Sequence, residues 1–132
     1  MNAKPAKQTL LMIFGAYAIL IILLNVFVGP AMQARNTPQT PVPFIAEIAG
    51  AGLCVYFSLY RMLPGGLLPS LAQFQANMLC ALAGAELVAL IGLFMGYGPV
   101  GPLPSAAIAL ALQFGFVLPK LLAYLRSSDS AG

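Results

Sequence analysis

The chain has 132 residues, of which 61% are hydrophobic and 7% are charged, and its mean hydropathy is +0.93. Soluble domains carry about 25% charged residues. A water-soluble core of this length cannot bury so much apolar surface, so the composition predicts an integral membrane protein with several spans. The net charge of +3 comes from six scattered cations, mostly near predicted helix ends, so we expect no nucleic-acid partner.

Residues for catalysis are scarce. The chain has no histidine, which removes the usual metal ligand and general base at neutral pH. Cys54 and Cys80 lie in apolar segments without CxxC spacing, and we expect both to act as small apolar side chains. No catalytic triad and no phosphate-binding glycine motif is present. The sequence therefore predicts a protein that is not an enzyme and holds no metal or cofactor.

Four apolar segments follow one another along the chain, at residues 9–28, 43–63, 74–97 and 103–125. Each has 20 or more residues, enough for a helix to cross about 30 Å of hydrocarbon. The first is longer than the core of a signal peptide, so we expect it to be retained. The predicted fold is all-α: one integral membrane domain of four transmembrane helices.

Glycine and proline mark the boundaries of these segments. Gly29-Pro30 ends the first, and residues 33–40 form a polar loop. Pro102 and Pro104 open the fourth segment, where a missing N–H costs little. Pro119 lies inside the fourth segment and predicts a kink or break.

The basic residues predict the orientation. With four crossings, both termini and the middle loop share one side of the membrane. That side carries five of the six cations, so the positive-inside rule predicts that both termini are cytoplasmic. The expected location is the plasma (inner) membrane. Tyr60 and Tyr124 would then be interfacial anchors there. The five cations are Lys4, Lys7, Arg61, Lys120 and Arg126, against Arg35 on the opposite side.

A weak internal repeat relates residues 9–30 to residues 78–99, with Gly29-Pro30 matching Gly98-Pro99. The helix after each copy opens with the pattern P-x-P-x-x-A. Two duplicated helix hairpins would explain the match, and chance similarity between apolar segments would explain it too.

Small residues recur at helical spacing in three of the four spans. Such stripes let helix backbones approach closely in a membrane. They serve either packing within the bundle or docking of a neighbouring subunit. The stripes are Ala46, Gly50, Cys54 and Ser58; then Ala81, Ala85, Ala89, Gly92 and Gly96; then Ala107, Ala111 and Gly115.

Glu86 is the principal candidate for a functional residue. It is the thirteenth residue of the third span and Gln113 is the eleventh of the fourth, so both lie near the midplane, with Tyr17 of the first span close by. A carboxylate in hydrocarbon is costly and marks a functional site by default. Since no cation lies at this depth, Glu86 is protonated or has an ion, water or another subunit as partner. A hydrogen bond from protonated Glu86 to Gln113, or from Tyr17 to ionised Glu86, would satisfy it. A packing role and a proton- or ion-linked role both stay open.

Glu47 is expected near the outer surface, at a depth similar to that of Asn25. Arg35, on the adjoining loop, could reach it. A carboxylate there also complements the positive end of a helix dipole. We therefore interpret Glu47, Asn25 and Arg35 as structural polar residues.

Two resemblances bear on function. Residues 78–93 read MLCALAGAELVALIGL, which resembles the carboxylate-bearing helix of the c-type proteolipids of rotary ATP synthases and would make Glu86 a proton carrier. The order of Arg61, Gly84 with Glu86, and Gln113 before Pro119 is similar to the ATP synthase i-protein. That family is a small non-enzymatic helper in assembling the membrane rotor.

The predicted function is a non-enzymatic accessory or assembly subunit of a larger membrane complex. The alternative is a small proton- or cation-coupled transporter or rotor-type subunit that uses Glu86. In either case the expected partners are membrane lipids and other membrane subunits or copies of the same chain.

Overall fold

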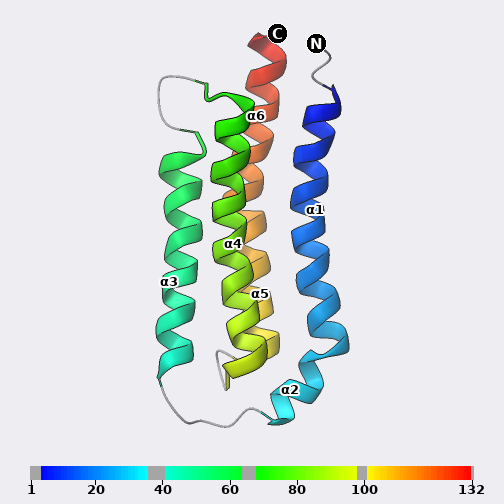
Figure 1. The fold of residues 1–132 in the computed structure, drawn as a ribbon, viewed down its shortest axis with the longest axis vertical. Helices are drawn as coiled ribbons and strands as arrows, with labels where there is room; N and C mark the ends of the chain where they lie inside the picture. Colours follow the sequence, from blue (N-terminus) through cyan, green and yellow to red (C-terminus); the bar gives the residue numbers. More distant parts are fainter. Residues whose placement is uncertain (1–3, 36–40, 64–67, 98–100, 132) are drawn as a thin grey trace.

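The structure is a computed structural model that describes residues 4–35, 41–63, 68–97 and 101–131. These residues form helices and no strand (Figure 1). In chain order the elements are α1 (Lys4–Phe27), α2 (Gly29–Arg35), α3 (Val42–Tyr56), η1 (Phe57–Arg61), α4 (Leu71–Met95), α5 (Pro102–Leu112), η3 (Gln113–Val117) and α6 (Leu118–Ala131).

Four helical stretches are long and apolar enough to cross a membrane, as the sequence predicted. They are Lys7–Phe27, Val42–Arg61, Leu71–Met95 and Pro102–Ser127. The start of α1 and the end of α6 lie at the same end of the bundle (Figure 1). An even number of long helices requires this arrangement, and the side of the membrane that this end faces stays a prediction.

The helices begin where local chemistry favours a start. Pro43 and Pro102 lie in the first turns of α3 and α5, where the missing N–H breaks no helical bond. Ser70 caps α4 from an extended backbone and accepts a hydrogen bond of 3.2 Å from the Gln73 amide. Residues Gly29–Arg35 form the short helix α2, so part of the polar loop expected at residues 33–40 is helical instead.

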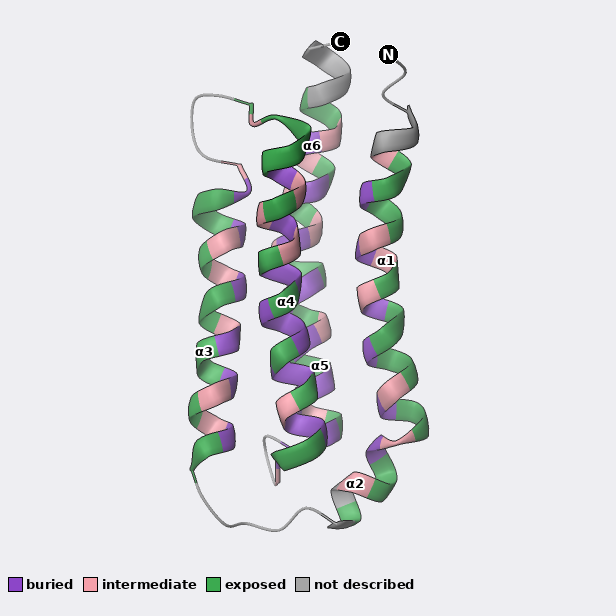
Figure 2. Cartoon of the chain, in the orientation of Figure 1, coloured by how far each residue is buried: buried purple, intermediate pink, exposed green. Residues whose placement is uncertain are grey.

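The helix α4 is the centre of the bundle. Of its most apolar stretch 56% is buried, against 28% to 33% for the other three long helices, because α4 packs against α3, α5 and α1 (Figure 2). Helices α1 and α3 lie on opposite sides of α4 and form no packed pair comparable to α4 with α5 (Figure 1). The two halves of the chain therefore do not repeat one packed hairpin.

The expected break at Pro119 is a π-helical turn instead. The chain stays helical through Pro119, and η3 immediately precedes it, with the Leu118 amide donating to the Gln113 carbonyl five residues back. A proline ring clashes with the carbonyl four residues before it, here that of Gly115. A wider turn over Gln113–Val117 moves this carbonyl away and lets the helix continue.

The aromatic contacts correct one expectation. Tyr124 is buried and its ring stacks on Phe74 at a centroid distance of 4.0 Å, so it is not an interfacial anchor facing lipid. Its hydroxyl donates to the Pro69 carbonyl over 3.3 Å, which ties α6 to the segment before α4.

Candidate functional site: a buried polar layer

Two glycines set the level at which α3 and α4 meet. A Cβ atom added to Gly84 would lie 2.6 Å from the Gly50 carbonyl oxygen and 2.8 Å from the Cys54 amide nitrogen. A Cβ atom added to Gly50 would lie 2.9 Å from the Gly84 carbonyl oxygen. The two backbones therefore touch, and Gly50 and Gly84 lie within about one helical turn of the same level along the bundle axis.

A second close contact sets the level of α5 against α4. A Cβ atom added to Gly92 would overlap the Ser105 side chain, so Gly92 and Ser105 are level. Because α4 and α5 run in opposite directions, Gln113, eight residues after Ser105, is level with Gly84, eight residues before Gly92. Both glycine contacts thus define one frame for the polar residues.

In this frame Glu86 and Gln113 share a level near the middle of α4. Glu86 follows Gly84 by two residues, a rise of about 3 Å. The same two residues turn the helix by about 200°, so Glu86 points away from α3. Side chains tilt toward the N-terminus of their helix, which brings the Glu86 and Gln113 side chains toward each other along the bundle axis.

Both side chains are buried and incompletely satisfied. Glu86 is 6% exposed and Gln113 is 0% exposed. One Glu86 carboxyl oxygen and both polar atoms of the Gln113 amide have no hydrogen-bond partner. The hydrogen bond expected from Glu86 to Gln113 is therefore not formed. Unpaired buried polar groups cost free energy, and such groups call for an explanation such as an ion, a water or a catalytic or transport role.

Tyr17 lies at about the level of this layer. Phe14 packs edge-on against Phe114 with ring centroids 5.3 Å apart, which aligns α1 with η3. Tyr17 is one helical turn after Phe14 and half-buried against the core. Among the described residues no hydrogen bond joins Tyr17 to Glu86.

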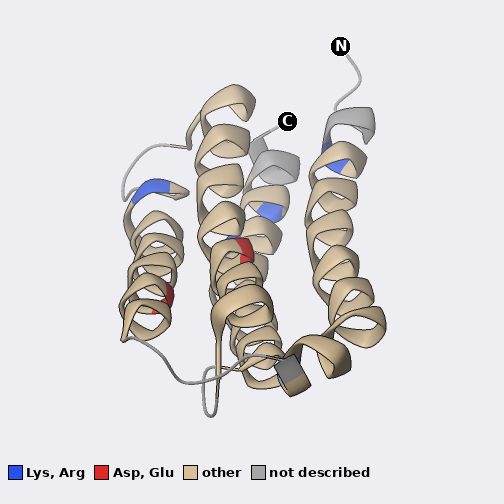
Figure 3. Ribbon diagram, turned by 60° about the horizontal axis from the view of Figure 1, so that its bottom comes forward, with Lys and Arg blue, Asp and Glu red and all other residues tan. Residues whose placement is uncertain are grey.

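Glu47 lies three residues before Gly50, about 4.5 Å along the axis toward the start of α3. It lies beside Ser105, which is level with Gly92, so Glu47 is nearer the α2 end of the bundle than Glu86 is. Its depth in a membrane stays a prediction. The two red positions in Figure 3 lie on neighbouring helices, one on α3 and one on α4.

Sequence reasoning missed the neighbour of Glu47. The Ser105 hydroxyl is close enough to interact with the Glu47 carboxyl, although neither carboxyl oxygen meets the geometry of a hydrogen bond. Ser105 follows Pro104 at the start of α5, where a serine normally predicts a helix cap. The sequence therefore gave no sign that Ser105 is fully buried against α3 and α4. The side chain of Arg35, the predicted partner of Glu47, lies outside the described part of the structure.

Asn25 belongs to a lower layer than Glu47. Its side-chain amide donates to the Ile21 carbonyl over 2.9 Å, and its oxygen lies beside Gly29, which also neighbours Leu103. Leu103 precedes Ser105 by two residues, so Asn25 lies nearer the α2 end of the bundle.

The three stripes of small residues divide into two kinds. In α3 and α4 they face the bundle interior: Ala46 is half-buried, and Gly50, Ala85, Ala89, Gly92 and Gly96 are buried. In the fourth long helix the stripe faces outward, because Ala107, Ala111 and Gly115 are exposed and no atom lies within 4 Å of a Cβ added to Gly115.

No group of three or more His, Cys, Asp or Glu side chains that could hold a metal ion occurs in the described part of the chain. Comparisons with protein families, with curated proteins and with solved structures found no match to this chain. The resemblances to ATP synthase membrane proteins therefore remain predictions from sequence. The fold and site define a four-helix bundle with buried, incompletely paired polar side chains.

Proposed function

We propose that the protein is a non-enzymatic, multi-pass membrane protein that works as a subunit of a larger membrane assembly. The outward stripe Ala107, Ala111 and Gly115 carries this proposal. The two inward stripes already bring α3, α4 and α5 into close contact. A third stripe on the outside lets the helix of a neighbouring subunit, or of a second copy, approach equally closely.

The test enlarges the stripe and measures assembly. Ala107→Leu together with Ala111→Leu should convert the complex isolated in mild detergent into monomer, as measured by light scattering and co-purification. Ala49→Leu is the matched control, since Ala49 is exposed on α3, away from the stripe. If the wild-type protein is a stable monomer that co-purifies with nothing, the proposal is wrong.

A second candidate function is proton- or cation-coupled transport through Glu86. It is supported by two unpartnered groups at nearly the same level of the bundle, a carboxyl oxygen of Glu86 and the side-chain amide of Gln113. A carboxyl group inside a bundle exchanges a proton or cation when neighbouring polar groups accompany it through the hydrocarbon. No described cation competes for it at this level.

Flux into proteoliposomes tests this candidate. Glu86→Gln should abolish proton-coupled flux, and Glu47→Gln should leave most of it, because Glu47 lies against Ser105 on the other side of α4. Wild-type vesicles without flux of any ion would exclude transport and leave the assembly role. Carbodiimide labelling gives a second test, since an accessible, protonated Glu86 should react and a packed Glu86 should stay unmodified.

A further inference from the structure

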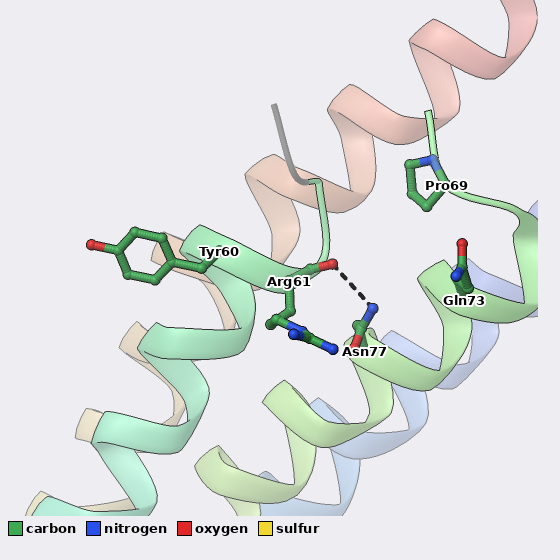
Figure 4. Close-up of a pocket in the computed structure, with 5 residues that line it drawn as sticks. All are labelled: Tyr60, Arg61, Pro69, Gln73 and Asn77. Carbon is green, nitrogen blue, oxygen red and sulfur yellow. Dashed lines mark hydrogen bonds between the residues drawn. The ribbon is translucent and has the colours of Figure 1, made fainter. Parts of the chain in front are cut away.

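A polar cavity lies where α3 and η1 end and α4 begins (Figure 4). It has a volume of ≈ 190 Å³, several times the roughly 30 Å³ that one water occupies in the liquid. Its lining differs from the apolar surface of the bundle in having a guanidinium group and two amides, whereas the Tyr60 ring points away from the other labelled side chains (Figure 4). The lining residues are Tyr60, Arg61, Pro69, Gln73 and Asn77.

Hydrogen bonds hold the walls of this cavity in place. The Asn77 amide donates to the Arg61 carbonyl over 3.0 Å, which ties the end of η1 to α4 (Figure 4). The Tyr124 hydroxyl holds the Pro69 carbonyl on the opposite wall. Because the Asn77 contact uses the Arg61 backbone, the Arg61 guanidinium keeps its five N–H donors.

Arg61 is the charged residue of the lining and is exposed. The two carboxyl groups whose side chains the structure describes, Glu47 and Glu86, lie beyond the Gly50–Gly84 contact, toward the other end of the bundle. Among the described side chains, therefore, no carboxylate pairs with Arg61. The Gln73 side-chain amide adds neutral donors, and a guanidinium with neighbouring N–H donors suits the oxygens of a phosphate.

The depth of the cavity suits a lipid headgroup. Arg61 follows Gly50 by eleven residues, about 16 Å along the axis, and Gly50 is level with the middle of α4. Half of a hydrocarbon core of about 30 Å is about 15 Å. If the bundle crosses a membrane, the Arg61 backbone lies at the edge of the hydrocarbon, from which its long side chain can extend to the lipid phosphates.

We propose that this cavity binds the phosphate group of an anionic phospholipid, with Arg61 as the principal ligand and Gln73 as a second donor. The site is independent of both proposed functions. It would fix the end of the bundle that carries the termini against one membrane leaflet.

Native mass spectrometry of the purified full chain, with phosphatidylglycerol or phosphatidylcholine added to the detergent, tests the proposal. The wild-type protein should retain phosphatidylglycerol in preference to phosphatidylcholine. Arg61→Gln should lower that retention roughly fivefold, which corresponds to about 1 kcal/mol for one cation near an anionic surface. Arg61→Lys keeps the charge but lacks the planar guanidinium, so its retention of phosphatidylglycerol should lie between those of the wild type and Arg61→Gln. Gln73→Leu should have a smaller effect of the same sign.

Arg126→Gln is the matched control, because Arg126 is an exposed cation at the same end of the bundle but does not line the cavity. Equal losses for Arg61→Gln and Arg126→Gln would overturn the proposal by showing a diffuse charge effect. Displacement of the lipid by inorganic phosphate would overturn the lipid assignment. If Arg61→Gln does not fold by circular dichroism, the Arg61→Lys result decides.

Discussion

The two sides of α4 are packed in different ways. On the side of α3 the backbones touch at Gly50 and Gly84, with no side chain between them. On the side of α6 larger side chains meet, as in the stacked Phe74–Tyr124 ring pair, and the Phe14–Phe114 pair joins α1 to η3 in the same way. Glu86 points away from α3, and one of its carboxyl oxygens is unpartnered, as is the Gln113 amide.

This difference shows where a membrane bundle can place a polar group. Lipid tails are as apolar as leucine, so helices associate through close packing and hydrogen bonds and not through exclusion from water. A backbone contact achieves this with glycine and leaves no space at the crossing. An interface of larger side chains keeps the helices further apart, which leaves room for a carboxyl and an amide. We therefore expect the α3 side to be sensitive to added volume and the opposite side to tolerate changes in polarity.

The largest effect is expected at the glycine contact. Gly84→Leu would force α3 and α4 apart and should destabilise the bundle by about 3 kcal/mol, the upper part of the usual cost of overpacking. Thermal unfolding in detergent measures this. Gly52→Leu on the outer face of α3, where no atom lies within 4 Å of an added Cβ, should change little. Equal effects of the two variants would contradict the backbone contact.

A smaller loss is expected on the side of α1. Phe14→Ala removes a ring that is 6% exposed and its edge-on partner contact, and should cost about 2 kcal/mol. The cost is below that of a soluble core because lipid surrounds the separated helices. The same unfolding assay applies, with Met12→Ala, 72% exposed on the same helix, as control. A loss larger than that of Gly84→Leu would reverse the comparison between the glycine contact and the ring packing.

Replacing the buried Gln113 amide should not lower the stability of the bundle, in contrast to the two changes above. Gln113→Leu removes two unpartnered polar atoms and keeps most of the volume, so the free energy of unfolding should stay level or rise by about 1 kcal/mol. Proteoliposome flux of the same variant shows whether the amide has a role in transport. A clear fall in stability would mean that Gln113 is hydrogen-bonded in the membrane.

The smallest effect concerns the ring pair at the end of the bundle. Tyr124→Phe keeps the stacking on Phe74 and removes only the 3.3 Å hydrogen bond to Pro69, so it should cost about 0.5 kcal/mol. Tyr56→Phe, on an exposed ring, is the control in the same assay. A cost above that of Phe14→Ala would show that hydrogen bonding and not ring packing dominates at this end.

The sequence by itself determined the four long helices and their approximate ends. Apolar length and the positions of glycine and proline are local properties, so residues 74–97 predicted α4 to within a few residues of Leu71–Met95. It also identified Glu86 and Gln113 as residues near one level, because each could be counted from the ends of its own span.

Only the tertiary structure decided how the helices are shifted and rotated against one another. In lipid every face of an apolar helix is acceptable, so hydropathy does not distinguish the buried Gly92 from the exposed Gly115. The contacts of Gly84 with Gly50 and Cys54 fix the level of α3 against α4, and Ser105 of α5 lies beside Glu47, which counting along one span could not give. Helix shift and rotation depend on contacts between residues far apart in the chain, and a single sequence does not record those contacts.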